Sequence, residues 1–441
     1  MWGRSIHIRF STGIVSVWLL CMLISIPGCQ RNNDARLYER EGIVTLTYWA
    51  APNPQEMELA DSLVRVWNKN NPNIRVRLQS IPVGQSTEEV LLAAIAAKTT
   101  PDICSNIWPG GLYDYTRAGG LVPLDSFADF DSVMSERLSI ELLETFRSED
   151  GHFYQVPWKT NPVMMIYNVR MLEELGYDEP PLTYSEYIDV GKRVREQFGD
   201  RVWMGQRDIR PIWWQRFFDF YPLYIAASGG KTLFCEGEID FVNEAAEQVL
   251  SFFNRCYSEG IYPRTFSHTR DPFLSENTVT NFAGPWQIPT VQRYAPHIEM
   301  GVSPIPVPDN HDGPVYTYGD FKNISIFSTT NHPDEAWEFV KFLIEAQNDL
   351  LLLEIANQIP ARYDLLDNPL FEDYFKQNPL VVKFANQAPY TRSVDAIPGL
   401  KEIFDAISQE YEASSVYGMK DPAQALSDAA RRSRVILDWL Q

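Results

Sequence analysis

The sequence predicts an α/β fold built as two domains or lobes. Segments with strand and helix patterns alternate along the chain, which is the pattern of a parallel sheet with right-handed helical crossovers. The chain has 441 residues, more than one typical domain needs. With 45% hydrophobic and 22% charged residues, its composition is that of a globular protein.

The alternation starts with residues 43–49, a β-branched and aromatic run that predicts a strand. Apolar residues at helical spacing then predict a helix that begins at Glu56. Residues 74–78 alternate like a second strand. A second helix over 88–98 and a third strand over 102–104 complete this unit.

The same alternation recurs further along the chain. Residues 163–169 predict a strand, residues 170–175 a short helix, and Thr183 a capped start for a helix over 184–198. Further short strands are expected at 278–283, 301–306 and 323–327. The chain after Pro333 is expected to be largely helical, with helices over 334–345, 347–355, 400–414 and 422–440.

Residues 1–28 have the composition of a signal peptide. A basic start precedes an uncharged apolar run over 12–26, which is short for a membrane span and has the length of a signal-peptide core. The run ends in Ile26-Pro27-Gly28-Cys29, which resembles a bacterial lipobox, except that proline replaces the usual small residue. The resemblance implies an exported protein that is lipidated at Cys29 and anchored to a membrane by its acyl chains. The polar composition of residues 29–42 is typical of a tether. An ordinary signal peptide with an incidental cysteine is the alternative.

Charge and cysteine content exclude several classes of function. The formal net charge of −20 excludes bulk DNA or RNA as a partner, because binding them needs a basic surface. No spacing among Cys and His residues indicates a metal site, and no cofactor is expected. Cys104 is expected to be a small buried side chain, whereas a disulfide between Cys235 and Cys256 is left open.

Five groups of segments occur in a fixed order along the chain. They are 45–49 with the polar loop after it; Thr100-Pro101-Asp102-Ile103 with 118–125; 154–157 with 165–168 and 175–184; 282–286 with 304–306; and 336–343 with 359–362 and 422–426. Together they resemble the extracellular solute-binding proteins of family 1, the maltodextrin-binding type that serves ABC importers. The chain departs from the family before Asn323, where a Gly pair is usual and Tyr318-Gly319-Asp320-Phe321 stands instead.

The resemblance implies a fold of the type II periplasmic-binding-protein kind. Two α/β lobes would be joined by a hinge of several crossings, with a small solute bound in the cleft between them. The first lobe would comprise 43–156 plus 303–343, and the second 157–302 plus 344–441. The partners implied are the solute, the permease of an ABC importer and the membrane that holds the anchor, and the chain is expected to be a monomer.

A sugar site needs aromatic platforms for C–H faces and polar side chains for hydroxyl edges. Such groups are expected on loops at the carboxyl ends of strands. Trp49, Asn53 and Gln55 lie at and after the end of the first strand, and Trp108 is expected to be an exposed platform after the third. Trp286, after Gly284-Pro285, matches the stacking aromatic of the family.

Further candidates lie near the expected hinge and in the second lobe. Trp158 and Lys159 follow Pro157, where the chain is expected to cross between lobes. Trp213 and Trp214 would point about 100° apart on a helix, so that one of them, left undecided, faces the cleft. Tyr318, Asp320 and Arg362 are additional candidates.

The tryptophans favour a di- or oligosaccharide as the solute, and Lys159, Arg207, Arg210 and Arg362 leave an acidic sugar open. A secreted carbohydrate-active enzyme is the main alternative, since two carboxylates suffice for glycoside hydrolysis. Neither a G-x-S-x-G elbow nor an H-E-x-x-H helix occurs, and a binder rather than an enzyme is therefore predicted. A sensor or adhesion lipoprotein with the same fold and no transporter is the other alternative.

Overall fold

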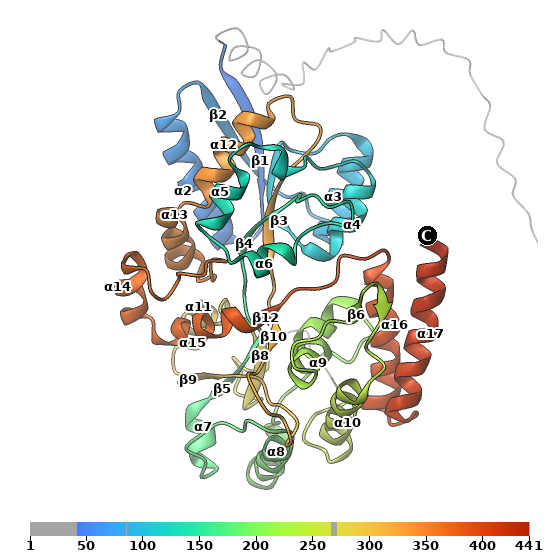
Figure 1. The fold of residues 1–441 in the computed structure, drawn as a ribbon. Helices are drawn as coiled ribbons and strands as arrows, with labels where there is room; N and C mark the ends of the chain where they lie inside the picture. The colour runs from blue at the N-terminus through green and yellow to red at the C-terminus, as the bar shows by residue number, and fades with distance from the viewer. Residues whose placement is uncertain (1–41, 85, 266–270, 441) are drawn as a thin grey trace, which may run out of the picture. The chain divides into compact units, whose positions relative to one another are not determined.

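A computed structural model describes residues 42–84, 86–265 and 271–440 (Figure 1). The expected signal peptide, Cys29 and residues 29–41 of the expected tether lie outside the described residues. The chain from Val44 onward forms one compact unit. Among the helices of the described ranges, none has both the length and the apolar character that a bilayer crossing requires.

A five-stranded sheet organises the first lobe, in the order β2-β1-β3-β11-β4. Its strands are β1 (Val44–Ala50), β2 (Ile74–Ser80), β3 (Ile103–Ile107), β4 (Val156–Lys159) and β11 (Lys322–Ile326). The helices packed around it include α2 (Pro54–Asn70), α3 (Thr87–Ala97), α4 (Leu112–Arg117), α5 (Phe130–Ser135), α6 (Ile140–Glu144) and α12 (Pro333–Leu343). The three strands predicted first are confirmed, and β1 runs parallel to both β2 and β3.

A three-stranded sheet of order β8-β5-β9 organises the second lobe. Its strands are β5 (Met164–Asn168), β8 (Thr280–Ala283) and β9 (Met300–Ser303), and β5 is antiparallel to both neighbours. The prediction of parallel pairing is therefore wrong for this sheet and for β11, which is antiparallel to β3 and β4. The pattern of apolar residues identifies a strand but not its direction, which depends on how the chain enters the sheet.

Helices make up most of the second lobe. They are α7 (Val169–Glu174), α8 (Tyr184–Phe198), α9 (Phe220–Ala227), α10 (Glu244–Ser258), α11 (Gln287–Tyr294), α14 (Pro369–Gln377), α15 (Pro379–Gln387), α16 (Leu400–Tyr411) and α17 (Pro422–Leu440). The helix α13 (Ala346–Leu351) contacts both α12 and α14. Short strand pairs β6 (Phe234–Cys235) with β7 (Glu238–Ile239), and β10 (Thr317–Tyr318) with β12 (Thr391–Arg392), complete the second lobe. Cys235 and Cys256 are free thiols here, and Cys104 is buried as predicted.

Three chain segments, called the crossings below, join the lobes and hydrogen-bond to one another. They contain Thr160 and Asn161, Asp320, and Ile359 to Ala361, in that order along the chain. The backbone of Thr160 donates to Ile359 O over 2.8 Å, and that of Asp320 donates to Asn161 O over 3.0 Å. Ala361 N donates to Trp158 O over 2.9 Å. The two-lobed α/β fold with several crossings is thus observed, while the lobe boundaries given above stay a prediction.

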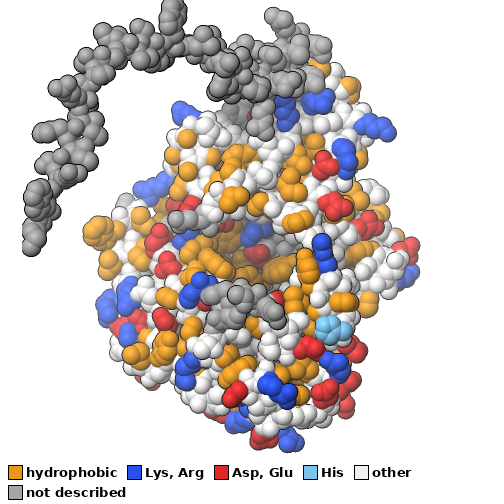
Figure 2. Space-filling view, turned by 180° about the vertical axis from the view of Figure 1, so that it is seen from behind, with side chains coloured by type: hydrophobic (Ala, Val, Ile, Leu, Met, Phe, Trp, Pro, Cys, Tyr) orange, Lys and Arg blue, Asp and Glu red, His pale blue; other side chains and the backbone are white. Residues whose placement is uncertain are grey.

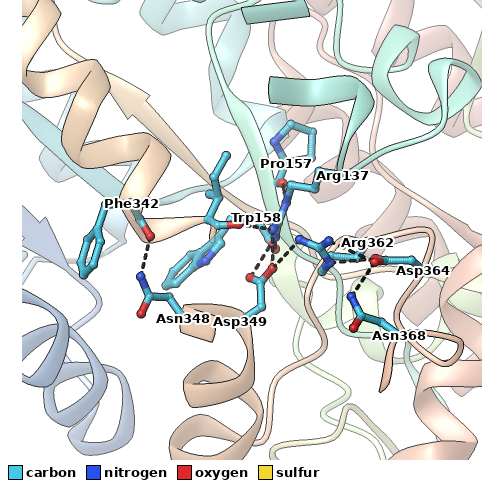
Figure 3. Close-up of polar contacts among 10 residues, drawn as sticks. Arg137, Pro157, Trp158, Phe342, Asn348, Asp349, Arg362, Asp364 and Asn368 are labelled. Atoms are coloured by element: carbon cyan, nitrogen blue, oxygen red, sulfur yellow. Dashed lines mark hydrogen bonds and ion pairs between the residues drawn. The ribbon is translucent and has the colours of Figure 1, made fainter. Parts of the chain in front are cut away.

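A buried ionic network fixes one side of these crossings (Figure 3). The Arg137 guanidinium donates to the carbonyls of Pro157 and Trp158 in β4 and pairs with Asp349 of α13. Arg362 donates to the same Asp349 carboxylate over 3.3 Å and to Asp364. The network therefore links β4, α13 and the crossing that contains Arg362. It fixes the positions of these three segments of the hinge relative to one another.

Candidate functional site

Two cavities meet on one face of the crossings, at Trp286. The first cavity, of about 490 Å³, and the second cavity, of about 480 Å³, are both bordered by this indole. Figure 2 shows the hollow in the middle of this face, with apolar, acidic and basic side chains inside it. Gly284 allows the arrangement, since a Cβ there would lie 2.1 Å from the Trp286 ring.

Polar side chains at the start of α2 line the first cavity. Asn53 follows β1 and caps α2 by accepting a hydrogen bond from Glu56 N over 2.9 Å. Gln55 lies beside it in the cavity wall. Asn53 and Gln55 are thus placed where the polar loop after the first strand was expected to contribute.

The buried Glu56–Lys159 pair lies under the first cavity. The two side chains approach to 2.7 Å, and Gln358 donates to the other Glu56 oxygen over 3.0 Å. Burial by itself would raise the pKa of Glu56, but Lys159 and its hydrogen-bond partners hold that pKa below the ordinary value. Burial also lowers the pKa of Lys159. Glu56 lines the cavity as a carboxylate, whereas Lys159 is fully buried beneath it.

Asp320 and Lys322 form a second ion pair, which lines the first cavity. The Lys322 ammonium donates to Asp320 Oδ1 over 2.6 Å, and the Tyr318 hydroxyl donates to the same oxygen over 3.1 Å. Both charged side chains are about one-fifth exposed and line the cavity. Together they present donors and an acceptor, which is what a sugar hydroxyl needs.

The second cavity combines an aromatic wall with paired charges. Trp214 lines it and is 43% exposed, while the neighbouring Trp213 ring packs on Trp108 with centroids 5.3 Å apart. Arg210 binds the buried Asp208 carboxylate in a bidentate manner. Trp214, and not Trp213, therefore faces the cavity, which answers the question that the sequence left open.

Several predicted site residues lie outside both cavities. Trp49 is nine-tenths buried and donates to Gln79 Oε1 over 3.1 Å, and Trp158 is a core residue. The Trp108 ring, predicted to be an exposed platform, is 3% exposed because Trp213 and Phe217 cover it. Tyr318 is also buried, and reaches the first cavity only through Asp320.

A third, opposite cavity of about 1030 Å³ lies across the crossings from the other two. Neighbouring residues of two crossings face different cavities: Thr160 and Phe321 line the opposite cavity, whereas Asn161 and Asp320 line the first. Arg362 lines the opposite cavity, where the Asp349 and Asp364 carboxylates hold it. The three crossings therefore form a partition, and Arg362 is on the side away from Trp286.

A sequence model described as bacterial extracellular solute-binding protein matches residues 62–381. The chain belongs to this family. The resemblance identified from the sequence is thereby confirmed. In this solute-binding protein the first cavity is lined by residues of both lobes, whereas the second cavity is lined by residues of the second lobe.

Relatives and solved structures agree with the fold. The solute-binding protein is 24% identical over 388 residues to a maltotriose-binding protein of Pyrococcus abyssi, covering 86% of this chain and 78% of the relative. A crystal structure of an uncharacterized protein of Listeria monocytogenes EGD-e has a TM-score of 0.79 and 30% identity, covering 89% of this chain and 100% of that one. A cyclic α-maltosyl-1,6-maltose binding protein of Arthrobacter globiformis has a TM-score of 0.77 at 18% identity, covering 90% and 99%, which shows the shared fold.

Other lining residues of this solute-binding protein were absent from the sequence prediction. They are Glu56, Asn106, Asn161, Thr290, Lys322 and Gln358 in the first cavity, and Asp208, Phe218, Asp271 and Asn281 in the second. Asn161 and Lys322 lie within three residues of predicted site positions. Their place beside the expected hinge could therefore have identified them from the sequence. Nothing in the local sequence marks Gln358, whose role follows from its hydrogen bond to Glu56.

Proposed function

We propose that this solute-binding protein binds a di- or oligosaccharide at Trp286 and delivers it to the permease of an ABC importer. The single observation that supports the proposal is that one indole borders two cavities whose other walls carry paired donors and acceptors. Adjacent cavities of about 490 and 480 Å³ suit a ligand of more than one ring. The names of the maltotriose-binding and cyclic maltosyl-maltose binding relatives support a carbohydrate.

We further infer that the protein is exported and lipidated at Cys29, and that it acts as a monomer which leaves glycosidic bonds intact. The basic and apolar start of the sequence supports export, and the family match supports a role outside the cytoplasm. A secreted enzyme would release shorter sugars, which chromatography of labelled oligosaccharides after incubation detects. A sensor or adhesion lipoprotein would not co-purify with a permease.

A thermal-shift screen of the purified protein against a panel of sugars tests ligand class. A sugar at a hundred times its dissociation constant adds about 2.7 kcal/mol to the free energy of unfolding. The Trp286→Ala variant should bind the best sugar about tenfold more weakly or worse, because the ring face that both cavities share is lost.

Trp439→Ala is the matched control, since this indole is 84% exposed near the end of α17 and borders neither cavity. Its affinity should equal that of the wild type. Unchanged affinity in Trp286→Ala would show that the ligand binds elsewhere, and a panel without any hit would refute the carbohydrate proposal.

A further inference from the structure

Asp320 presents one unused oxygen to the first cavity. Its Oδ1 accepts from both Tyr318 and Lys322, whereas Oδ2 has no hydrogen-bond partner within the described ranges. The side chain is 20% exposed and lines the cavity. Oδ2 is therefore the acceptor that a ligand hydroxyl would meet, and its direction depends on what holds Oδ1.

The Tyr318 hydroxyl that holds Oδ1 is itself fixed. Its ring is 1% exposed and stacks on Phe217 with centroids 5.0 Å apart and an interplanar angle of 24°. The hydroxyl accepts a hydrogen bond from Trp108 Nε1 over 3.2 Å, which directs its own proton toward Asp320. A tyrosine that could rotate freely would not orient a carboxylate in this way.

Trp108 reaches Tyr318 from the other lobe. It follows β3 of the first sheet, yet its ring packs on Trp213 and Phe217, which precede α9. A Cβ at Gly110 would lie 2.3 Å from this ring, so the loop after Trp108 needs glycine there to fold under the indole. Residues of both lobes therefore form this contact.

We propose that Trp108 and Tyr318 are positioning residues that orient Asp320 Oδ2 toward a sugar hydroxyl in the first cavity. This inference rests on the proposed carbohydrate function. Trp108 acts through a hydrogen-bond chain of Trp108, Tyr318 and Asp320 rather than as the stacking platform expected from its position in the sequence. Because the hydrogen-bond chain needs Trp108 to lie against the second-lobe rings, the acceptor stays aligned as long as this contact between the lobes holds.

A double-mutant cycle on the full protein tests this. Affinity for the best sugar of the panel is measured by calorimetry for wild type, Tyr318→Phe, Asp320→Ala and the double variant. Tyr318→Phe should weaken binding about tenfold, since a hydrogen bond to a charged group is lost. In the Asp320→Ala background the same change should have less than a twofold effect, because the oxygen that accepts from Tyr318 is gone. Trp108→Phe, which keeps a ring and loses the indole N–H, should weaken binding in the same direction.

Tyr221→Phe is the matched control. Tyr221 is fully buried in the same aromatic cluster, and its hydroxyl donates to Ser393 O over 2.8 Å rather than to Asp320. It should bind sugar like the wild type. Equal losses in Tyr318→Phe and Tyr221→Phe, or a Tyr318→Phe effect that persists undiminished in Asp320→Ala, would overturn the inference while leaving carbohydrate binding intact. If the wild type binds no sugar, the proposed function fails and this inference fails with it.

Discussion

Trp286 differs from most other tryptophans of the chain in where its ring lies. Trp67, Trp158 and Trp337 are between 2% and 6% exposed and pack in the core of the first lobe. Trp286 instead covers Gly284 and borders both cavities. Several tryptophans of the described residues therefore serve core packing, and the rings that border a cavity are the ones that bear on ligand binding.

The carboxylate of Asp395 is expected to make the free energy of unfolding depend on pH. It accepts from Thr232 Oγ1 over 2.7 Å and from Leu233 N over 3.1 Å, and burial raises its pKa to about 6. Because the folded-state pKa is above the ordinary value, ionisation favours the unfolded chain. The contribution of Asp395 to the free energy of unfolding therefore falls as pH rises from about 4 to about 6, and stays constant above that.

Asp395→Asn removes this titration. Urea unfolding at pH 4 and pH 7 should show that the substitution destabilises less at pH 7 than at pH 4, by about 1–3 kcal/mol. Asp189→Asn, at a side chain that is 72% exposed, should change stability equally at both values. An equal effect of Asp395→Asn at the two pH values would show that its burial does not oppose ionisation.

At the scale of elements, the strands β1, β2, β3 and β11 and the helices α2, α8, α12, α16 and α17 were predictable because each has a regular apolar period, whereas β4 was not predicted. α10 carries the same signal, with Val249, Phe253 and Tyr257 spaced four apart, although the prediction leaves this segment out. Strand direction in the second sheet has no local signal. Asn53 and Trp286 could be placed in the site from their position after strands, whereas Gln358 depends on a contact between distant segments.

The Arg137–Asp349–Arg362 network yields a prediction for the hinge elements. Asp349 is fully buried and accepts from both guanidinium groups, so Asp349→Ala leaves two cations without their shared partner. The free energy of unfolding should fall by about 3–5 kcal/mol in urea titration. Glu338→Ala breaks the exposed Glu338–Lys341 pair and should cost less than about 1 kcal/mol. Similar losses in the two variants would contradict a structural role for the network.

At the scale of the whole molecule, the three crossings separate the Trp286 cavities from the larger opposite cavity. Residues next to each other on one crossing, such as Asp320 and Phe321, face different sides. Lobe movement about these crossings would therefore change the spaces on the two sides together. Bound ligand stabilises the closed arrangement only to the extent that it contacts both lobes, and the first cavity is lined by Asn53 of the first lobe and Trp286 of the second.

A crystal structure of the protein with the best sugar of the screening panel tests the central claim most directly. Sugar density is expected against the Trp286 indole, extending into both the first and the second cavity, with a hydroxyl within hydrogen-bond distance of Asp320. Density confined to the opposite cavity beside Arg362, with the space at Trp286 empty, would contradict it.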